Sequence, residues 1–339
     1  MQVQNSYADG DLTGQHALNR SLVFDIGFTA LLFGLLIYGA LYIEPAISAN
    51  PDHRPVAAIL IPALLPIGAL TFLSFVERLF PPAGPRKCLR TYLLHLQINI
   101  FQFFVGGLFS IITVLACTAG AHRFGFSLGL IDLRFASGKG ILGLVATAWL
   151  GAVVGDFFFY WFHRALHQTP VLWAHHKMHH MDEELESITY NRQNWIEGLF
   201  ASIFLIVPSV ILFKFDELDV WQLGLVSGSI VAVVNVLAAI GHLNVRWQVG
   251  RASLFYCSPQ VHRIHHSRLP QHHDKNFAFV LPLWDWLFGT YYAPKRNEFP
   301  PTGVDGEVEI KSFLEAQIFT PREWWRMFRA WRAEQGKYF

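Results

Sequence analysis

The sequence predicts an all-α fold: a polytopic membrane helix bundle with a cytosolic helical cap that holds a histidine-rich dimetal site. The chain of 339 residues is 53% hydrophobic and 15% charged, whereas soluble domains are about 25% charged. Its apolar residues gather in runs of about 20, the length that a helix needs to cross a bilayer. Histidine is the second signal, because 12 of the 16 histidines lie between His163 and His273. Together these features predict a multi-pass integral membrane protein with a metal site.

Charge and cysteine content argue against two classes of protein. The chain has 26 basic and 25 acidic side chains, a net charge of +1, so it offers no field that would attract nucleic acid. Cys88, Cys117 and Cys257 are widely separated and odd in number. They therefore predict neither a disulfide framework nor a cysteine-based metal knuckle.

Residues 1–162 are predicted to form about four transmembrane helices. The first apolar run is too long for the core of a cleaved signal peptide, so it is interpreted as a membrane anchor. Pro62 and Pro66 predict a kink in the second run, which neighbouring helices can accommodate. The four runs cover residues 22–43, 55–76, 98–119 and 140–162.

Residues 163–298 form the predicted catalytic region, which includes a membrane hairpin at about 198–240. Its first arm, 198–213, is short for a span and contains Pro208, so the hairpin either crosses the membrane or re-enters on the same side. In both cases the chain returns to its starting side. All the histidine motifs are then on one face of the membrane.

Basic residues predict which face that is. After residue 160 the chain carries 17 of its 26 lysines and arginines, and basic residues in short loops favour the cytoplasm. We therefore expect the histidine motifs and the N-terminus on the cytoplasmic side.

Residues 299–339 form a predicted loop and a C-terminal amphipathic helix. Thr320, Pro321 and Glu323 resemble a capping box that would open this helix. Aromatic residues then alternate with arginines, as in helices that lie in the lipid headgroup region; packing of this helix against the protein body is the alternative. The interleaved residues are Trp324, Trp325, Phe328 and Trp331 with Arg322, Arg326, Arg329 and Arg332.

Three histidine clusters carry the predicted chemistry. Residues at i, i+3 and i+4 share one side of a helix, so each cluster can aim several imidazoles at one point. Eight such ligands are too many for one ion, which favours a dimetal centre. The first cluster is His163 and His167, the second is His176, His179 and His180, and the third is His262, His265 and His266.

Other histidines and two carboxylates complete the candidate site. His242 follows an apolar segment on the same predicted side and is a ninth candidate ligand. Possible extra ligands are His175, His272 and His273, whereas His16, His53, His95 and His122 are interpreted as structural. Asp156 and Asp274 are expected to accept the outer N–H of ligand histidines, which would fix the orientation of the rings.

The motifs resemble the fatty acid hydroxylase and sterol desaturase superfamily of integral-membrane di-iron oxygenases. The resemblance covers about residues 150–295 and is carried by DFFFYWFHRALH, LWAHHKMHH, and VHRIHH followed by DKNFAFVLPLWDWLFGTYY. It is nearest to the alkylglycerol monooxygenase branch, although Gln168 stands where that branch tends to carry a glutamate, which argues against pterin-dependent ether-lipid activity. The resemblance implies two iron ions, held by the nine histidines named above.

The implied reaction is hydroxylation of a lipid or other hydrophobic substrate at a C–H bond with dioxygen. No nucleotide-binding motif is found, so two electrons must come from an external reductase, ferredoxin or cytochrome. A desaturase on the same site and a non-enzymatic membrane metal-binding or transport protein are the alternatives. A zinc hydrolase is disfavoured, because Arg164 and Arg263 stand where H-E-x-x-H requires glutamate. Zinc can nevertheless replace iron in purified histidine sites.

Overall fold

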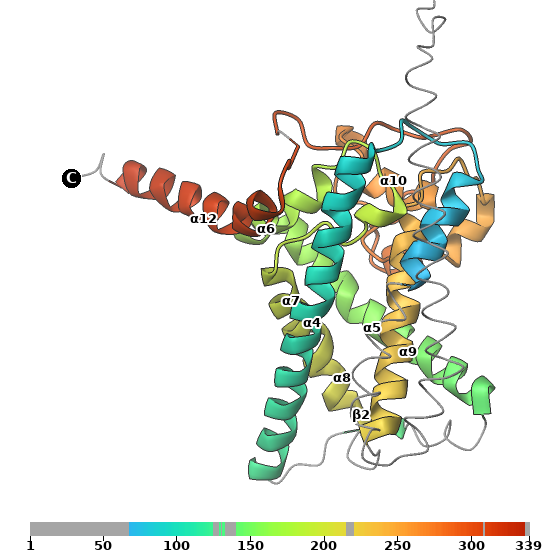
Figure 1. Cartoon of the computed structure of the whole chain (residues 1–339), viewed down its shortest axis with the longest axis vertical. Coiled ribbons are helices and arrows are strands. Elements are labelled where there is room, and N and C mark those ends of the chain that lie inside the picture. Colours follow the sequence, from blue (N-terminus) through green and yellow to red (C-terminus); the bar gives the residue numbers. More distant parts are fainter. Residues whose placement is uncertain are drawn as a thin grey trace, which may run out of the picture.

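The computed structural model describes residues 68–124, 129, 131–132, 140–214, 220–307 and 309–335. Within these ranges the regular structure is almost entirely helical (Figure 1). The predicted first membrane helix and most of the second lie outside the described residues, although 68–78 is helical. The strands found in this part of the chain are β1 (Ile131–Asp132) and β2 (Phe213–Lys214), which pair in parallel.

Three long helices run along the long axis of the molecule: α4 (Leu89–Phe124), α5 (Gly140–Gln168) and α9 (Val220–Gly241). The segments Leu89–Cys117 and Val145–Gln168 are long and apolar enough to cross a membrane. Only 6% of the most apolar stretch of the first segment is buried inside the protein. Several apolar side chains of this helix are exposed, among them Leu108, Ile112 and Leu115 at 57%, 52% and 65%.

The region predicted as a hairpin descends through three short helical elements and returns through α9. The descending elements are α7 (Ile196–Ala201), the π-helical turn η5 (Ser202–Ile206) and α8 (Val207–Leu212). Pro208 has no N–H to give to the preceding turn, which accounts for the wide turn there. β2 then pairs with β1, which lies between α4 and α5. The hairpin thus reaches the connection between these two long helices before α9 returns to the opposite end.

Glycines allow the long helices to approach closely. A Cβ on Gly151 of α5 would lie 2.5 Å from the Ile230 side chain of α9, and one on Gly198 of α7 would lie 3.1 Å from Gly106 of α4. Small residues at such crossings are typical of helix packing in membranes. The close packing holds α5 and α9, whose ends carry His163, His167 and His242, at a fixed spacing.

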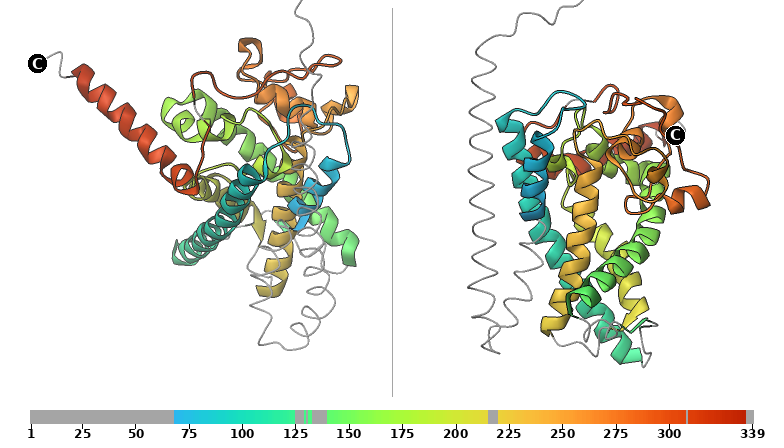
Figure 2. Two further views of the ribbon diagram at one scale, coloured as in Figure 1. Left: turned by 45° about the horizontal axis from the view of Figure 1, so that its top comes forward. Right: turned by 90° about the vertical axis from the view of Figure 1, so that its right-hand side faces the viewer.

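Short helices and loops form a cap over one end of the bundle (Figure 2). The cap contains α6 (Pro170–His180), η4 (Ser187–Thr189), η6 (Gly250–Leu254), α10 (Pro259–His265), η7 (Pro270–His272) and α11 (Leu283–Leu287). A buried apolar cluster joins α4, α6 and the last helix, α12 (Phe313–Gln335), through Ile98, Met178, Met181, Ile310, Ala316 and Phe319.

The start of α12 differs from the prediction. The helix begins at Phe313 rather than near Thr320. Its first turn is capped by Ser312, whose Oγ accepts the Glu315 N–H at 3.2 Å. The Glu315 carboxylate in turn accepts the Lys311 N–H at 3.0 Å. The helix continues through Pro321, which cannot donate to the carbonyl of Gln317. The side-chain amide of Asn194 donates to that carbonyl instead, so the carbonyl keeps a partner although the helix lacks its own hydrogen bond there.

Candidate metal centre

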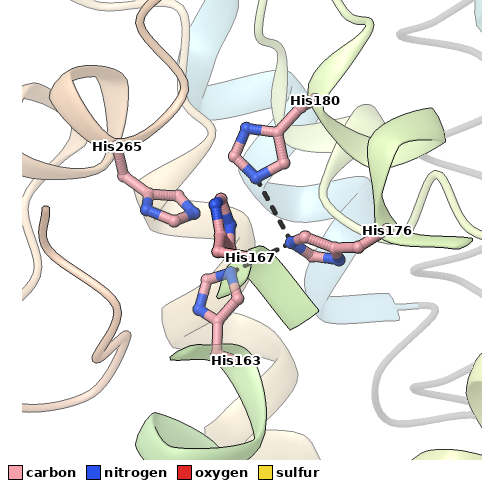
Figure 3. Close-up of side chains that lie close together, drawn as sticks. All are labelled: His163, His167, His176, His180 and His265. Carbon is pink, nitrogen blue, oxygen red and sulfur yellow. Dashed lines mark hydrogen bonds between the residues drawn. The ribbon is translucent and has the colours of Figure 1, made fainter. Parts of the chain in front are cut away.

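Nine histidines converge in two groups inside the cap. The five residues of the first histidine group come from α5, α6 and α10 and are drawn in Figure 3. The four residues of the second group come from α6, the end of α9, and α10. In each group the candidate ligand atoms lie within 4.8 Å of one another. The first group is His163, His167, His176, His180 and His265, and the second is His179, His242, His262 and His266.

The second and third clusters are each divided between the two groups, contrary to the expectation that a cluster points at one site. Residues four apart on a helix differ by about 40° in direction, whereas residues three apart differ by about 60° the other way. His176 and His180 accordingly share the first group, while His179 faces the second. His262 and His266 share the second group, while His265 faces the first. The two helices thus hold the groups side by side.

The imidazole nitrogens are spaced as metal ligands would be. Nε2 of His176 lies 3.0 Å from Nε2 of His163 and 3.2 Å from that of His180 (Figure 3). In the second group, Nε2 of His262 lies 2.9 Å from that of His242 and 3.1 Å from that of His266. Two nitrogens bound at right angles to one ion, each about 2.1 Å away, would be about 3.0 Å apart. Each group is therefore able to hold a metal ion.

Burial keeps His179 and His265 neutral, as a metal ligand must be. Burial and the neighbouring His265 lower the pKa of His179 to about 3. Burial also lowers the pKa of His265 to about 4, even though its hydrogen bond to the Lys275 carbonyl acts in the opposite direction. At neutral pH both rings retain a free lone pair.

Backbone carbonyls fix two rings of the first group. His163 Nδ1 donates to the carbonyl of Phe277 at 2.6 Å, and His265 Nδ1 donates to that of Lys275 at 2.9 Å. A carbonyl can only accept, so the proton sits on Nδ1 and Nε2 is left as the ligand atom. In the second group Thr189 Oγ1 lies 3.4 Å from His242 Nδ1.

Gly241 brings the end of α9 close to α10 in the second group. A Cβ at this position would lie 3.2 Å from the His262 ring. That is tighter than an ordinary van der Waals contact, so a larger residue would press on the ring.

Asp156 supports the first group differently from the prediction. Its carboxylate accepts no histidine N–H; it accepts the backbone N–H groups of Phe279, Val280 and Leu281 at 3.1, 3.1 and 2.8 Å. Asp285 accepts the backbone N–H groups of Phe277 and Ala278 at 2.7 and 2.8 Å. Five successive amides, residues 277–281, are thus tied to two buried carboxylates. This segment carries the carbonyl that orients His163.

Asp274 does not take the predicted role either. It is an exposed residue with a φ of 58° on the loop before this segment. Its position in a turn explains why it cannot reach the buried rings.

Replacing Asp156 by alanine should destabilise the protein by about 3 kcal/mol or more, because it leaves several buried amide groups without an acceptor. It should also lower metal binding by the first histidine group, since the carbonyl that orients His163 would shift. Thermal unfolding in detergent and metal analysis check both effects. Asp274→Asn is the matched control, because asparagine tolerates its positive φ; equal effects in both variants would contradict the role given to Asp156.

The three possible extra ligands lie outside both groups. His175 is occupied at both ring nitrogens, with Nε2 2.6 Å from Glu197 Oε2 and Nδ1 3.0 Å from Thr320 Oγ1. His272 Nδ1 lies 2.9 Å from Ser267 Oγ, and His273 is exposed. His95 is also outside the two groups, and its Nδ1 donates to the Thr91 carbonyl at 2.7 Å.

The fold and the site define a helical protein whose cap presents two adjacent histidine groups able to bind metal ions. Residues 148–290 match the family described as fatty acid hydroxylase, which confirms the resemblance carried by the histidine clusters. The match begins in α5 and ends after α11, so it includes all nine histidines of the two groups.

Curated relatives are similar to about half of this chain. An ornithine lipid hydroxylase from Rhizobium tropici is 31% identical over 172 residues, which is 51% of this chain and 49% of that protein. The alkylglycerol monooxygenases of Danio rerio and Homo sapiens are each 32% identical, over 52% and 54% of this chain and 38% of each relative. The chain thus matches about half or less of the length of these relatives. No solved structure gave a significant match.

Proposed function

We propose that the protein is a membrane-bound non-haem di-iron oxygenase that uses dioxygen and two external electrons to hydroxylate a lipid or other hydrophobic substrate at a C–H bond. The observation that carries the proposal is the pair of adjacent histidine groups, with five and four members. The match of residues 148–290 to the fatty acid hydroxylase family supports this reaction class. So does the similarity of about half of the chain to an ornithine lipid hydroxylase and to alkylglycerol monooxygenases.

The nine histidines would hold the two irons, one in each group. When bound, iron supplies the redox chemistry that activates dioxygen toward an unactivated C–H bond. The protein residues hold the site in place: the carbonyls of Phe277 and Lys275 keep the Nδ1 protons of His163 and His265, so that Nε2 of each ring faces inward.

Side chains around the groups control access. His167 is half-buried, whereas the other eight histidines are buried. The half-buried Trp173 ring lies 5.1 Å from the His167 ring and 5.4 Å from that of His180, centre to centre. We place the approach of the substrate at this side of the first group, where an indole ring can exclude water and contact an acyl chain.

Lipid mass spectrometry of expressing cells grown in isotopically labelled dioxygen tests the reaction. The proposed hydroxylase should produce a lipid that is heavier by one labelled oxygen atom, and a variant lacking His262 should not. A product lighter by two hydrogen atoms would identify a desaturase. If no lipid changes while the protein binds or moves metal ions, the non-enzymatic alternative is favoured.

The membrane topology proposed here places the histidine cap and the N-terminus in the cytoplasm. A single cysteine introduced at Gln168 should therefore resist a membrane-impermeant thiol reagent in intact cells, while one at Asn50 should react. Permeabilised cells provide the control for reactivity. The reverse labelling pattern would contradict the orientation given by the basic residues.

A further inference from the structure

The outer half of α12 exposes a row of aromatic rings that the metal centre does not use. Trp325, Phe328 and Trp331 are 59%, 44% and 56% exposed. Their rings form a ladder, with centres 5.6 and 5.9 Å apart between successive members. Figure 1 shows this part of the helix projecting away from the body of the molecule.

The exposed residues form one stripe with a basic border. At about 100° per residue, Trp325, Phe328 and Trp331 span a sector of about 120°. Leu314 and Ile318, which are 68% and 47% exposed, extend the same stripe toward the root of the helix. Arg329 and Arg322 lie about 40° and 60° beyond its edge, and Arg332 lies within it. Arg326 is on the far side of the helix and pairs with Glu323 at 2.6 Å. An apolar stripe bordered by arginine is the pattern of a helix that lies on an anionic membrane surface.

The place where α12 meets α4 gives an independent indication of its depth. The Phe313 ring of α12 packs against the Phe101 ring of α4 with centres 5.3 Å apart, and Ala316 and Phe319 share a buried cluster with Ile98. The apolar run predicted to span the membrane begins at Ile98. Figures 1 and 2 show α12 leaving this point across the axis of α4, so it lies near the level of the membrane surface.

We propose that the outer half of α12 docks on the membrane surface, with Trp325, Phe328 and Trp331 at the boundary between headgroups and acyl chains. Arg329 and Arg332 then contact the phosphates of anionic lipids. This inference rests on the membrane location proposed above, and it adds an interaction surface outside the metal centre.

Docking there also fixes the distance of the metal centre from the membrane surface, because α12 is hydrogen-bonded to α6. Lys177 Nζ lies 2.9 Å from Glu323 Oε2, and Trp324 Nε1 donates to the Val171 carbonyl at 2.7 Å. α6 carries His176, His179 and His180. A helix held at the lipid surface therefore restrains the element that supplies ligands to both groups.

Fluorescent labels in lipid nanodiscs test the proposal on the full-length chain. The exposed Cys88 and half-buried Cys117 are replaced by serine, while the buried Cys257 stays. An environment-sensitive dye is attached at Phe328→Cys, at Ala330→Cys on the opposite side of the helix, or at Leu108→Cys in the middle of α4. Lipids spin-labelled near the headgroup, and others spin-labelled deeper in the chain, then quench whichever dyes they contact.

We expect the deeper spin label to quench the dye at 108. We expect the shallow spin label to quench the dye at 328 about twofold or more strongly than the dye at 330. Quenching at 108 without quenching at 328 would overturn the docking of α12 while leaving the membrane location intact. Quenching at neither position would overturn both. Equal quenching at 328 and 330 would show that the helix does not lie as proposed.

Charge and partner are tested separately. The double change of Arg329 and Arg332 to glutamine should weaken quenching at 328 in nanodiscs containing anionic lipid, while Arg251→Gln, an exposed arginine elsewhere in the cap, should not. An equal effect of both variants would contradict the arginine contacts. Shielding of the dye at 328 in detergent that grows with protein concentration would assign the stripe to contact between copies of the chain instead.

Discussion

Replacing His179 by alanine should reduce the bound iron from two ions per chain to about one and lower product formation by roughly a hundredfold or more. Loss of a residue that only orients a metal ligand already costs about 10- to 100-fold, and His179 is one of just four histidines in the second group. Its removal leaves three imidazoles there and leaves the first group complete. Iron analysis after anaerobic loading, together with product formation, measures both effects.

Two variants make the result specific. His180→Ala lies next in the sequence but removes a member of the first group, so it should weaken binding of the other ion, at a site that keeps four imidazoles. His273→Ala changes an exposed histidine outside both groups and should keep both ions and full turnover. If the His179 variant retains two ions and turns over normally, the division of the second cluster between two groups is wrong.

His175→Ala should lower thermal stability without loss of metal, unlike the variants at His179, His180 and His273. The sequence alone predicts a mild effect, because an i+1 neighbour of a ligand points elsewhere. In the structure His175 links Glu197 to Thr320 of α12, so its removal leaves a buried carboxylate without its partner. We expect lower thermal stability with both ions retained, and loss of both ions would contradict the separation of its role from that of His176.

The sequence predicted the helices of the site better than their relation to one another. Helical spacing within each cluster depends on local periodicity, so the membership of the candidate site followed from the residues alone. The separation of His179 from His176 and His180 depends on where α9 and α10 approach α6. That placement is set by packing between segments far apart in the chain, such as Gly241 against His262.

Long-range hydrogen bonds explain why the predicted role of Asp156 and the predicted start of α12 were wrong. Asp156 was expected to contact a histidine because it lies two turns before His163, but its partners are backbone amides more than 120 residues away. Pro321 was taken for a helix start, although Asn194 supplies the hydrogen bond that lets α12 continue through it. The true start at Ser312 and Glu315 was readable as S-x-x-E. Pro321 was preferred as the first helical residue because proline is common at that position.

A protein loaded with zinc in both histidine groups should be as stable as the iron form and should form no product. Neutral imidazoles bind either ion, and an ion that binds only the folded state stabilises it by mass action, by about 4 kcal/mol at a thousandfold excess over its Kd. Zinc cannot change its oxidation state, so it should support the fold of the cap without supporting the reaction.

This exchange separates the structural role of the metal from its redox role, which substitution of a ligand cannot do. Thermal unfolding of the metal-free, zinc-loaded and iron-loaded proteins should give a low midpoint for the first and similar, higher midpoints for the other two. Product formation with dioxygen and an added electron donor should occur only with iron, and it should return when zinc is removed and iron restored. Turnover by the zinc-loaded protein would mean that the reaction needs no electron transfer at the metal, and the oxygenase proposal would then fail even though both histidine groups bind metal.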